Sequence, residues 1–181
     1  MQKLVAAFIS VMLLTAVPRA QQDAQPVVYK VSFASAAHHV ADVEVTFSGV
    51  PDGKLEARMS RSSPGRYAVH EFAKNVYDVH AFDGKGKELV AARPNPYQWD
   101  VSGHDGTVRL TYKVFGDLVD GTYLAVDPTH AHMNMPATLM WARRFDDRPV
   151  RVTFTPPAAS CRPRGQIPTG GTCRTTAVAS R

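Results

Sequence analysis

Residues 107–115 are Thr-Val-Arg-Leu-Thr-Tyr-Lys-Val-Phe, a stretch in which apolar and polar side chains alternate. Its apolar positions lie two residues apart, whereas an amphipathic helix needs them three and four apart. A period of two places the apolar side chains on one face of a β-strand and the polar side chains on the other. The stretch therefore predicts a strand with one buried face.

The same alternation recurs along most of the chain. Strands are expected at Val27–Phe33, Val43–Phe47, Leu55–Met59, Tyr77–Phe82, Trp99–Val101, Thr107–Phe115, Tyr123–Val126 and Val150–Phe154. Asp-Gly pairs at 52–53, 83–84, 105–106 and 120–121 supply the turn residues that hairpins require. Short helical turns are expected at Glu71–Asn75 and Ala137–Ala142, the latter with Pro136 at its start. The predicted fold class is all-β: an antiparallel β-sandwich or curved two-sheet domain with one or two short helical turns.

Both ends of the chain differ from its middle. Residues 1–20 predict an export signal, because Lys3 precedes a 14-residue stretch from Leu4 to Val17 that is almost wholly apolar. Cleavage is expected after Ala20, or as late as Ala24. The stretch is short for a membrane span, so we expect a periplasmic or secreted protein, with an uncleaved anchor as the alternative. Residues 25–157 are expected to form the folded domain and residues 158–181 an unstructured tail.

The net charge of +5 comes from the two ends of the chain. Between Gln21 and Ser160 there are 15 Lys and Arg residues against 16 Asp and Glu residues. A nucleic-acid binder concentrates basic charge on its folded part, so no nucleic-acid partner is expected. Cys161 and Cys173 both lie in the tail, where they either form a disulfide in an oxidising compartment or have no role.

Residues 130–141, His-Ala-His-Met-Asn-Met-Pro-Ala-Thr-Leu-Met-Trp, gather chemically active side chains between two strand patterns. His130 and His132 would lie on the same face of a strand, and Asp127 could complete a three-ligand metal site. The alternative is a structured loop whose polar side chains bind only the protein itself. No further partner for a metal site is evident, so the sequence assigns none here.

His70-Glu71 is half of the His-Glu-x-x-His motif of zinc peptidases. Position 74 is Lys, so the second zinc ligand is missing and a cation stands in its place. The complete motif occurs nowhere in the 181 residues. We therefore expect this pair to belong to a structural turn.

Several short motifs resemble those of the glycyl aminopeptidase family of zinc metallopeptidases, distant relatives of aminopeptidase N. Residues 63–67, Ser-Pro-Gly-Arg-Tyr, are similar to the family's Trp-Ser-Pro-Gly-x-Tyr signature, with Ser62 in place of Trp. The other matching segments follow in family order: His70–Val76, Trp99–Val101, Gly103–Gly106, Gly121–Leu124 and the block at 130–141. The resemblance covers roughly residues 27–157 and implies the N-terminal β domain of such a peptidase.

This resemblance implies a fragment of an exported aminopeptidase that stops before its catalytic domain. It implies no catalytic residue and no metal in this chain, with zinc bound only in full-length family members, which release N-terminal glycine. The expected partners are the missing catalytic zinc domain and, through it, a peptide substrate. The loop at 130–135 is then expected to face that domain or its substrate cleft, with His130, His132, Asn134 and Met135 as candidate residues. The alternative function is a stand-alone periplasmic β-sandwich binding module.

Overall fold

A seven-stranded sheet forms the larger layer of the computed structural model, which describes residues 25–156 and 175–179. Its strands, in spatial order, are β13 (Thr175–Ala179), β12 (Val150–Thr155), β1 (Val27–Ser32), β2 (Val40–Ser48), β8 (Thr107–Phe115), β4 (Val76–Asp83) and β5 (Glu88–Leu89). Neighbouring strands are antiparallel except β1 and β12, which run parallel with Val27 beside Val150. The predicted antiparallel sheet is therefore mixed at this one pair.

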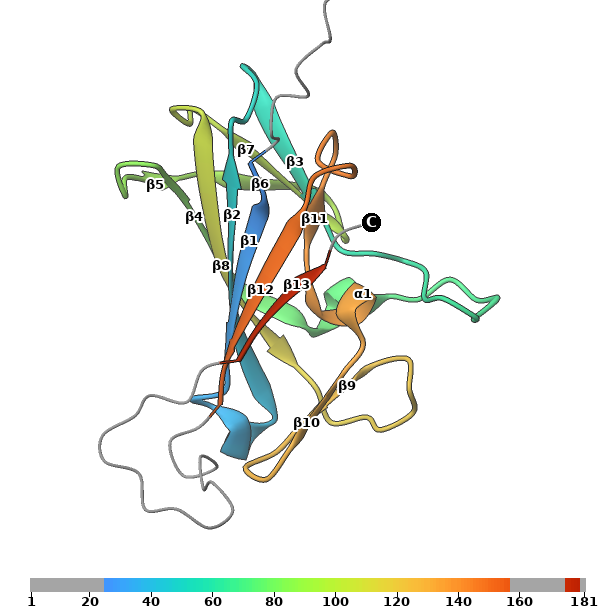
Figure 1. Cartoon of the computed structure of the whole chain (residues 1–181). Helices are drawn as coiled ribbons and strands as arrows, with labels where there is room; N and C mark the ends of the chain where they lie inside the picture. Colours follow the sequence, from blue (N-terminus) through green and yellow to red (C-terminus); the bar gives the residue numbers. More distant parts are fainter. Residues whose placement is uncertain (1–24, 157–174, 180–181) are drawn as a thin grey trace, which may run out of the picture.

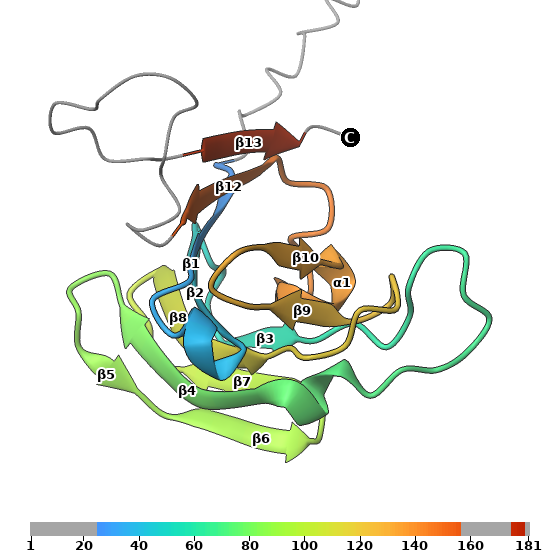
Figure 2. The ribbon, with the colours of Figure 1, turned by 90° about the horizontal axis from the view of Figure 1, so that it is seen from below.

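A four-stranded sheet packs against the inner face of the first one. Its order is β11 (Trp141–Ala142), β3 (Lys54–Arg58), β7 (Gln98–Ser102) and β6 (Ala91–Asn95). A separate hairpin, β9 (Leu124–Val126) and β10 (Ala131–Met133), lies below the smaller sheet in Figure 1. Figure 2 shows the larger sheet curving around the hairpin and the smaller sheet. The predicted two-sheet, all-β fold is confirmed.

The core lies between the sheets and follows the alternation of the sequence. In β8, Val108, Leu110, Tyr112 and Val114 are buried. They lie beside the buried valines and Phe47 of β2, with Val45 opposite Leu110. Each such side chain contributes about 1.5–3 kcal/mol by leaving water, so this shared apolar face is what holds the layers together.

Three single turns of helix interrupt the strands: η1 (Ala36–His38), η2 (Phe72–Asn75) and α1 (Met135–Thr138). The turn expected at Glu71–Asn75 corresponds to η2. Helix α1 has Pro136 in its first turn, as expected, but begins two residues earlier than predicted and ends at Thr138. No helix in the described part of the chain is long and apolar enough to cross a membrane.

Two buried tyrosines fasten the segment after α1 to the larger sheet. The Tyr29 hydroxyl donates to the carbonyl of Met140 at 2.7 Å, and the Tyr112 hydroxyl donates to the carbonyl of Thr138 at 3.0 Å. The Tyr112 hydroxyl also accepts the backbone N–H of Met140 at 2.9 Å. Burial raises the pKa of both tyrosines, so both hydroxyls keep their protons for these bonds. They fix where α1 and β11 lie.

Several predictions concern residues outside the described ranges. The export signal at 1–20 and both cysteines, Cys161 and Cys173, belong to this group. Most of the tail at 158–181, predicted to be unstructured, also lies outside them. Its described part, Thr175–Ala179, is strand β13, which pairs with β12.

Candidate functional site

The turn between β9 and β10 is organised by the carboxylate of Asp127. Its Oδ1 accepts the hydroxyl of Thr129 at 2.6 Å and the backbone N–H groups of Thr129 and His130 at 2.6 and 3.0 Å. The hydrogen bond from the Thr129 hydroxyl is the main reason that the pKa of Asp127 falls to about 2. His130 Nδ1 lies 2.9 Å from the other carboxylate oxygen, so this histidine closes the turn.

His132 lies in the middle of β10, opposite Ala125, and is exposed. Within residues 25–156 and 175–179, no three His, Cys, Asp or Glu side chains gather in a group that could hold a metal ion. The described residues therefore offer no ligand set that fits zinc. The hairpin therefore exposes two imidazoles to solvent, those of His130 in the turn and His132 in β10.

Asn134 points into the protein rather than toward solvent. Its Nδ2 donates to Ser63 Oγ at 3.0 Å and to the carbonyl of Thr122. Asparagine often caps a helix with its side chain at this position, but here the side chain makes no bond to α1. It joins three segments of the chain, which the sequence does not reveal because Ser63 is 71 residues away.

Met135 begins α1 and is partly exposed. It lines an apolar hollow of about 500 Å³ between α1 and β11 on one side and β1 and β12 on the other. The hollow also contacts Leu139, Trp141 and Val152. Of the four predicted site residues, Met135 is therefore the one that reaches an apolar cavity.

The His70-Glu71 pair has structural partners. The His70 ring stacks on Phe72, with ring centroids 5.0 Å apart, and meets Tyr123 edge-on. The Glu71 carboxylate pairs with Arg61 at 2.6 Å. These contacts agree with the expected structural turn, which continues as η2.

Strand β12 ends beside the β9–β10 turn. A hollow of about 130 Å³ is lined by Pro156, Phe33 and residues 127–131. Pro156 follows the end of β12, so it is the last described residue before the gap. The hairpin with His130 and His132 therefore adjoins the end of β12, and the described chain resumes at β13, which pairs with β12.

Two loops carry exposed apolar side chains that sequence reasoning did not single out. Tyr67 and Val69 are exposed in the loop between β3 and η2, as are Leu118 and Val119 in the loop before β9. The loops meet where Arg66 Nη2 donates to the carbonyl of Asp120 at 3.0 Å. The Ser-Pro-Gly-Arg-Tyr motif marked the first loop, but nothing in the sequence indicated that the second lies beside it.

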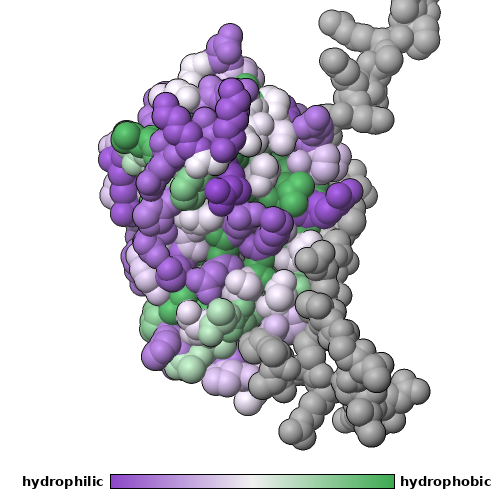
Figure 3. Space-filling model, turned by 90° about the vertical axis from the view of Figure 1, so that its left-hand side faces the viewer, coloured by the Kyte–Doolittle hydropathy of each residue, from purple (hydrophilic) through white to green (hydrophobic). Residues whose placement is uncertain are grey.

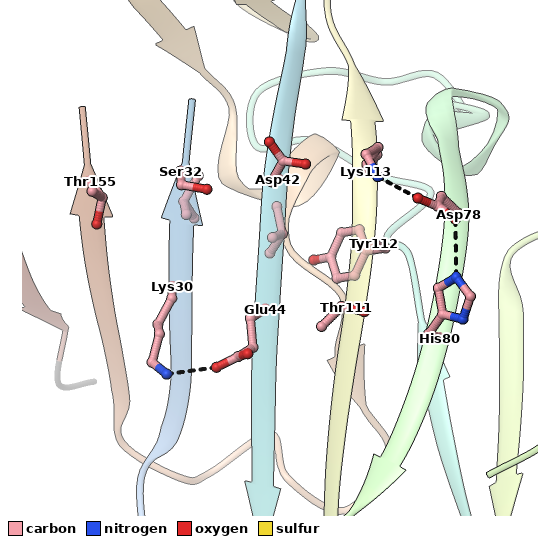
Figure 4. A pocket seen from close by; sticks show the side chains of 12 residues that line it. Lys30, Ser32, Asp42, Glu44, Asp78, His80, Thr111, Tyr112, Lys113 and Thr155 are labelled. Atoms are coloured by element: carbon pink, nitrogen blue, oxygen red, sulfur yellow. Dashed lines mark hydrogen bonds and ion pairs between the residues drawn. The ribbon is translucent and has the colours of Figure 1, made fainter. Parts of the chain in front are cut away.

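A polar hollow of about 340 Å³ crosses the outer face of the larger sheet (Figure 4). Two pairs of its charged side chains neutralise one another, since Lys30 pairs with Glu44 at 2.7 Å and Lys113 with Asp78. One carboxylate oxygen of Asp42, which also lines the hollow, is buried without a hydrogen-bond partner among the described residues. His80 lies 3.0 Å from Asp78. Figure 3 views the molecule from this side, where hydrophilic residues cover most of the surface. The hollow is a solvated sheet face with paired charges.

The chain is similar in sequence to one protein family and in structure to two known proteins. Residues 28–173 match the family model described as the peptidase M61 N-terminal domain. The structure is similar to that of an aminopeptidase N family protein from Idiomarina loihiensis, with a TM-score of 0.71 and 17% sequence identity, over 83% of this chain and 27% of that chain. An M1 zinc metallopeptidase from Deinococcus radiodurans matches less well, with a TM-score of 0.42 and 14% identity, over 75% of this chain and 32% of that one.

The first of these likenesses concerns the fold alone, because the identity is low. This chain spans about a quarter of the length of the Idiomarina protein, since 27% of that protein is covered. No curated protein matches the chain.

Proposed function

The chain belongs to the family of the peptidase M61 N-terminal domain, the glycyl aminopeptidase family, and from this we propose that it is the non-catalytic β domain of an exported zinc aminopeptidase. Residues 28–173 match the family, which is most of the chain. The complete zinc motif is absent from the sequence. The reaction therefore requires groups that another region supplies.

The observation that carries this proposal is the match of residues 28–173 to the N-terminal domain of the family, in a sequence that holds no complete zinc motif. Pro156 lies against the turn that bears His130, and the described chain resumes as β13, which ends at Ala179 beside Val150, at the other end of β12. His130 and His132 are exposed on the β9–β10 hairpin, and in this proposal they form part of the wall between the two regions, close to the substrate cleft.

The chemistry divides between the two regions. Zinc, when bound by the catalytic region, polarises the scissile carbonyl and activates water. The residues of this chain hold the hairpin in place, orient the two imidazoles and limit the access of water to one side of the cleft. The substrate class proposed with the family is a peptide with N-terminal glycine.

The first test separates this role from that of an enzyme. Purified chain from Gln25 to Arg181 is incubated with glycine p-nitroanilide and added zinc, and bound metal is measured. We expect no hydrolysis above the blank and no bound zinc after dialysis. Hydrolysis with about one zinc per chain would overturn the proposal.

The second test asks whether a catalytic region is encoded downstream, and whether the chain is exported. Sequencing the DNA beyond codon 181 should reveal a His-Glu-x-x-His segment in one of the reading frames, and joining it in frame should give activity toward the same substrate. In a bacterial host, the chain should reach the periplasm with a new N-terminus at Gln21 or Gln25. Absence of the zinc motif downstream would contradict the proposed catalytic region. Retention of the chain in the cytoplasm with Met1 would contradict the proposed export.

The competing role is a stand-alone binding module, favoured by the polar hollow in Figure 4. Lys30, Glu44, Lys113 and Asp78 are already paired there, so Asp42, with one partnerless carboxylate oxygen, is the main charged group left for a ligand. The domain role is therefore preferred.

A further inference from the structure

Apolar side chains gather on two neighbouring loops of the domain. Among the described residues, nine large apolar side chains are exposed, and four of them are Tyr67, Val69, Leu118 and Val119. The loops that carry these four project together on the right in Figure 1 and again in Figure 2. Clustered exposed apolar groups usually mark a surface that another protein covers.

The charged groups of these loops already have partners within the domain. Arg61 pairs with Glu71, Arg66 donates to the Asp120 carbonyl, and Lys74 lies 5.3 Å from the centre of the Tyr123 ring. A partner therefore gains little from charge here. The surface exposes apolar side chains to water, so the partner that covers it must itself be apolar at this contact.

Asn134 fixes both loops to the start of α1. Its amide reaches Ser63 Oγ in one loop and the Thr122 carbonyl in the other. Ser63 and Thr122 are only 7% and 4% exposed, so water cannot easily replace these bonds. Met135, the next residue, is also exposed, and its side chain lines the apolar hollow between α1 and β12.

We propose that the loops at 59–71 and 116–123, together with Met135, form one preassembled docking surface for the catalytic region, and that Asn134 is its positioning residue. This inference rests on the proposed function. The last described strand, β13, ends at Ala179 beside Val150, and Val150 lines the same hollow as Met135, so the described chain ends near this part of the surface. The matched Idiomarina chain is long enough to supply such a region, since only 27% of it is covered.

The surface is tested by binding. The catalytic region encoded beyond codon 181 is produced as a separate polypeptide, and its Kd for the purified chain is measured by calorimetry. The double variant Tyr67→Ser/Leu118→Ser should weaken binding by about tenfold or more, because exposed apolar anchors dominate such contacts. The control is Val90→Ser, which removes an apolar side chain that is 81% exposed and lies outside these loops, and which should leave the Kd unchanged.

The role of Asn134 is tested by comparing the effect of one substitution on the Kd in the native chain and in the double variant. Asn134→Asp keeps the shape but places a carboxylate oxygen against the Thr122 carbonyl. It should weaken binding in the native background by about tenfold, but by less than about twofold in the Tyr67→Ser/Leu118→Ser background. Its effect on the midpoint of urea unfolding should be the same in both backgrounds. A merely structural role would lower stability without this coupling.

The possible failures are distinguishable. If the region exists and binds the native chain, but the double variant binds equally well, the surface is wrong and the proposed function stands. Equal losses from Asn134→Asp in both backgrounds would remove its positioning role. If no zinc region is encoded, or if it does not bind the native chain, the proposed function fails and the surface fails with it.

Discussion

Asp127 is held ionised by the turn that it organises. Its pKa of about 2 lies below the usual 3.8, so the carboxylate stabilises the folded state fully above the usual pKa and progressively less as pH falls through the lower one. Asp127→Asn should therefore lower the thermal midpoint near about pH 6, and the difference from the native chain should shrink toward about pH 2. Thermal unfolding followed by circular dichroism measures this. A difference that grows in acid would contradict the assignment.

His80 should show the opposite dependence on pH. The hydrogen bond to Glu88, and then that to Asp78, raises its pKa above 6.5. The protonated imidazole therefore stabilises the folded state, and this contribution is lost as the pH rises through the pKa of His80 in the folded protein. His80→Gln should therefore cost more stability near about pH 5.5 than near about pH 8.5. The exposed His132, replaced in the same way, is the control; a larger His80 effect in alkali would refute the prediction.

The sequence singled out candidate side chains, but not what each one contacts. His130 and His132 would share a face if both lay in a strand; His132 lies in β10, whereas His130 lies in the turn before it. The bond from His130 to Asp127 is local, so a sequence can suggest it. The bonds of Asn134 join residues far apart in the chain, and only the packing of the loops creates them.

At the level of elements, long alternating patterns predicted strands well. The range Thr107–Phe115 was predicted with its observed bounds, and β2 extends three residues earlier than expected. The strands β5, β6, β10, β11 and β13 were missed, and β5, β10 and β11 have only two or three residues, which are too few to show a period. Parallel pairing of β1 with β12 depends on contacts between residues more than a hundred positions apart.

The tyrosine contacts that hold α1 and β11 give an element-level prediction. Tyr112→Phe leaves the Thr138 carbonyl and the Met140 N–H buried without a partner. We expect a loss of about 1–3 kcal/mol in the free energy of unfolding, measured by urea denaturation. The control is Tyr77→Phe, which removes a hydroxyl from a tyrosine that is 44% exposed and should change the free energy of unfolding little. Equal effects of the two substitutions would show that the buried contacts contribute nothing.

At the level of the whole molecule, alternation predicts which residues are buried but not which surfaces stay uncovered. The two-sheet core follows from the periodic strands. The meeting of the loops at 59–71 and 116–123 follows from the path of the chain around the β9–β10 hairpin, which no local pattern encodes (Figure 1). The docking surface is therefore a property of the assembled fold.

The loop between β3 and η2 should be the first part of residues 25–156 that a protease cuts. It runs for thirteen residues, 59–71, without a strand or helix, and Tyr67 is fully exposed. Proteases need an extended, locally unfolded segment, and such segments are found in long exposed loops. Brief trypsin treatment should therefore cleave after Arg66 before it cleaves after Arg109, which lies in central strand β8. Mass spectrometry identifies the fragments, and Arg66→Gln should abolish this cut alone. Cleavage after Arg109 at an equal rate would mean that the sheet opens as readily as the loop, and would contradict the prediction.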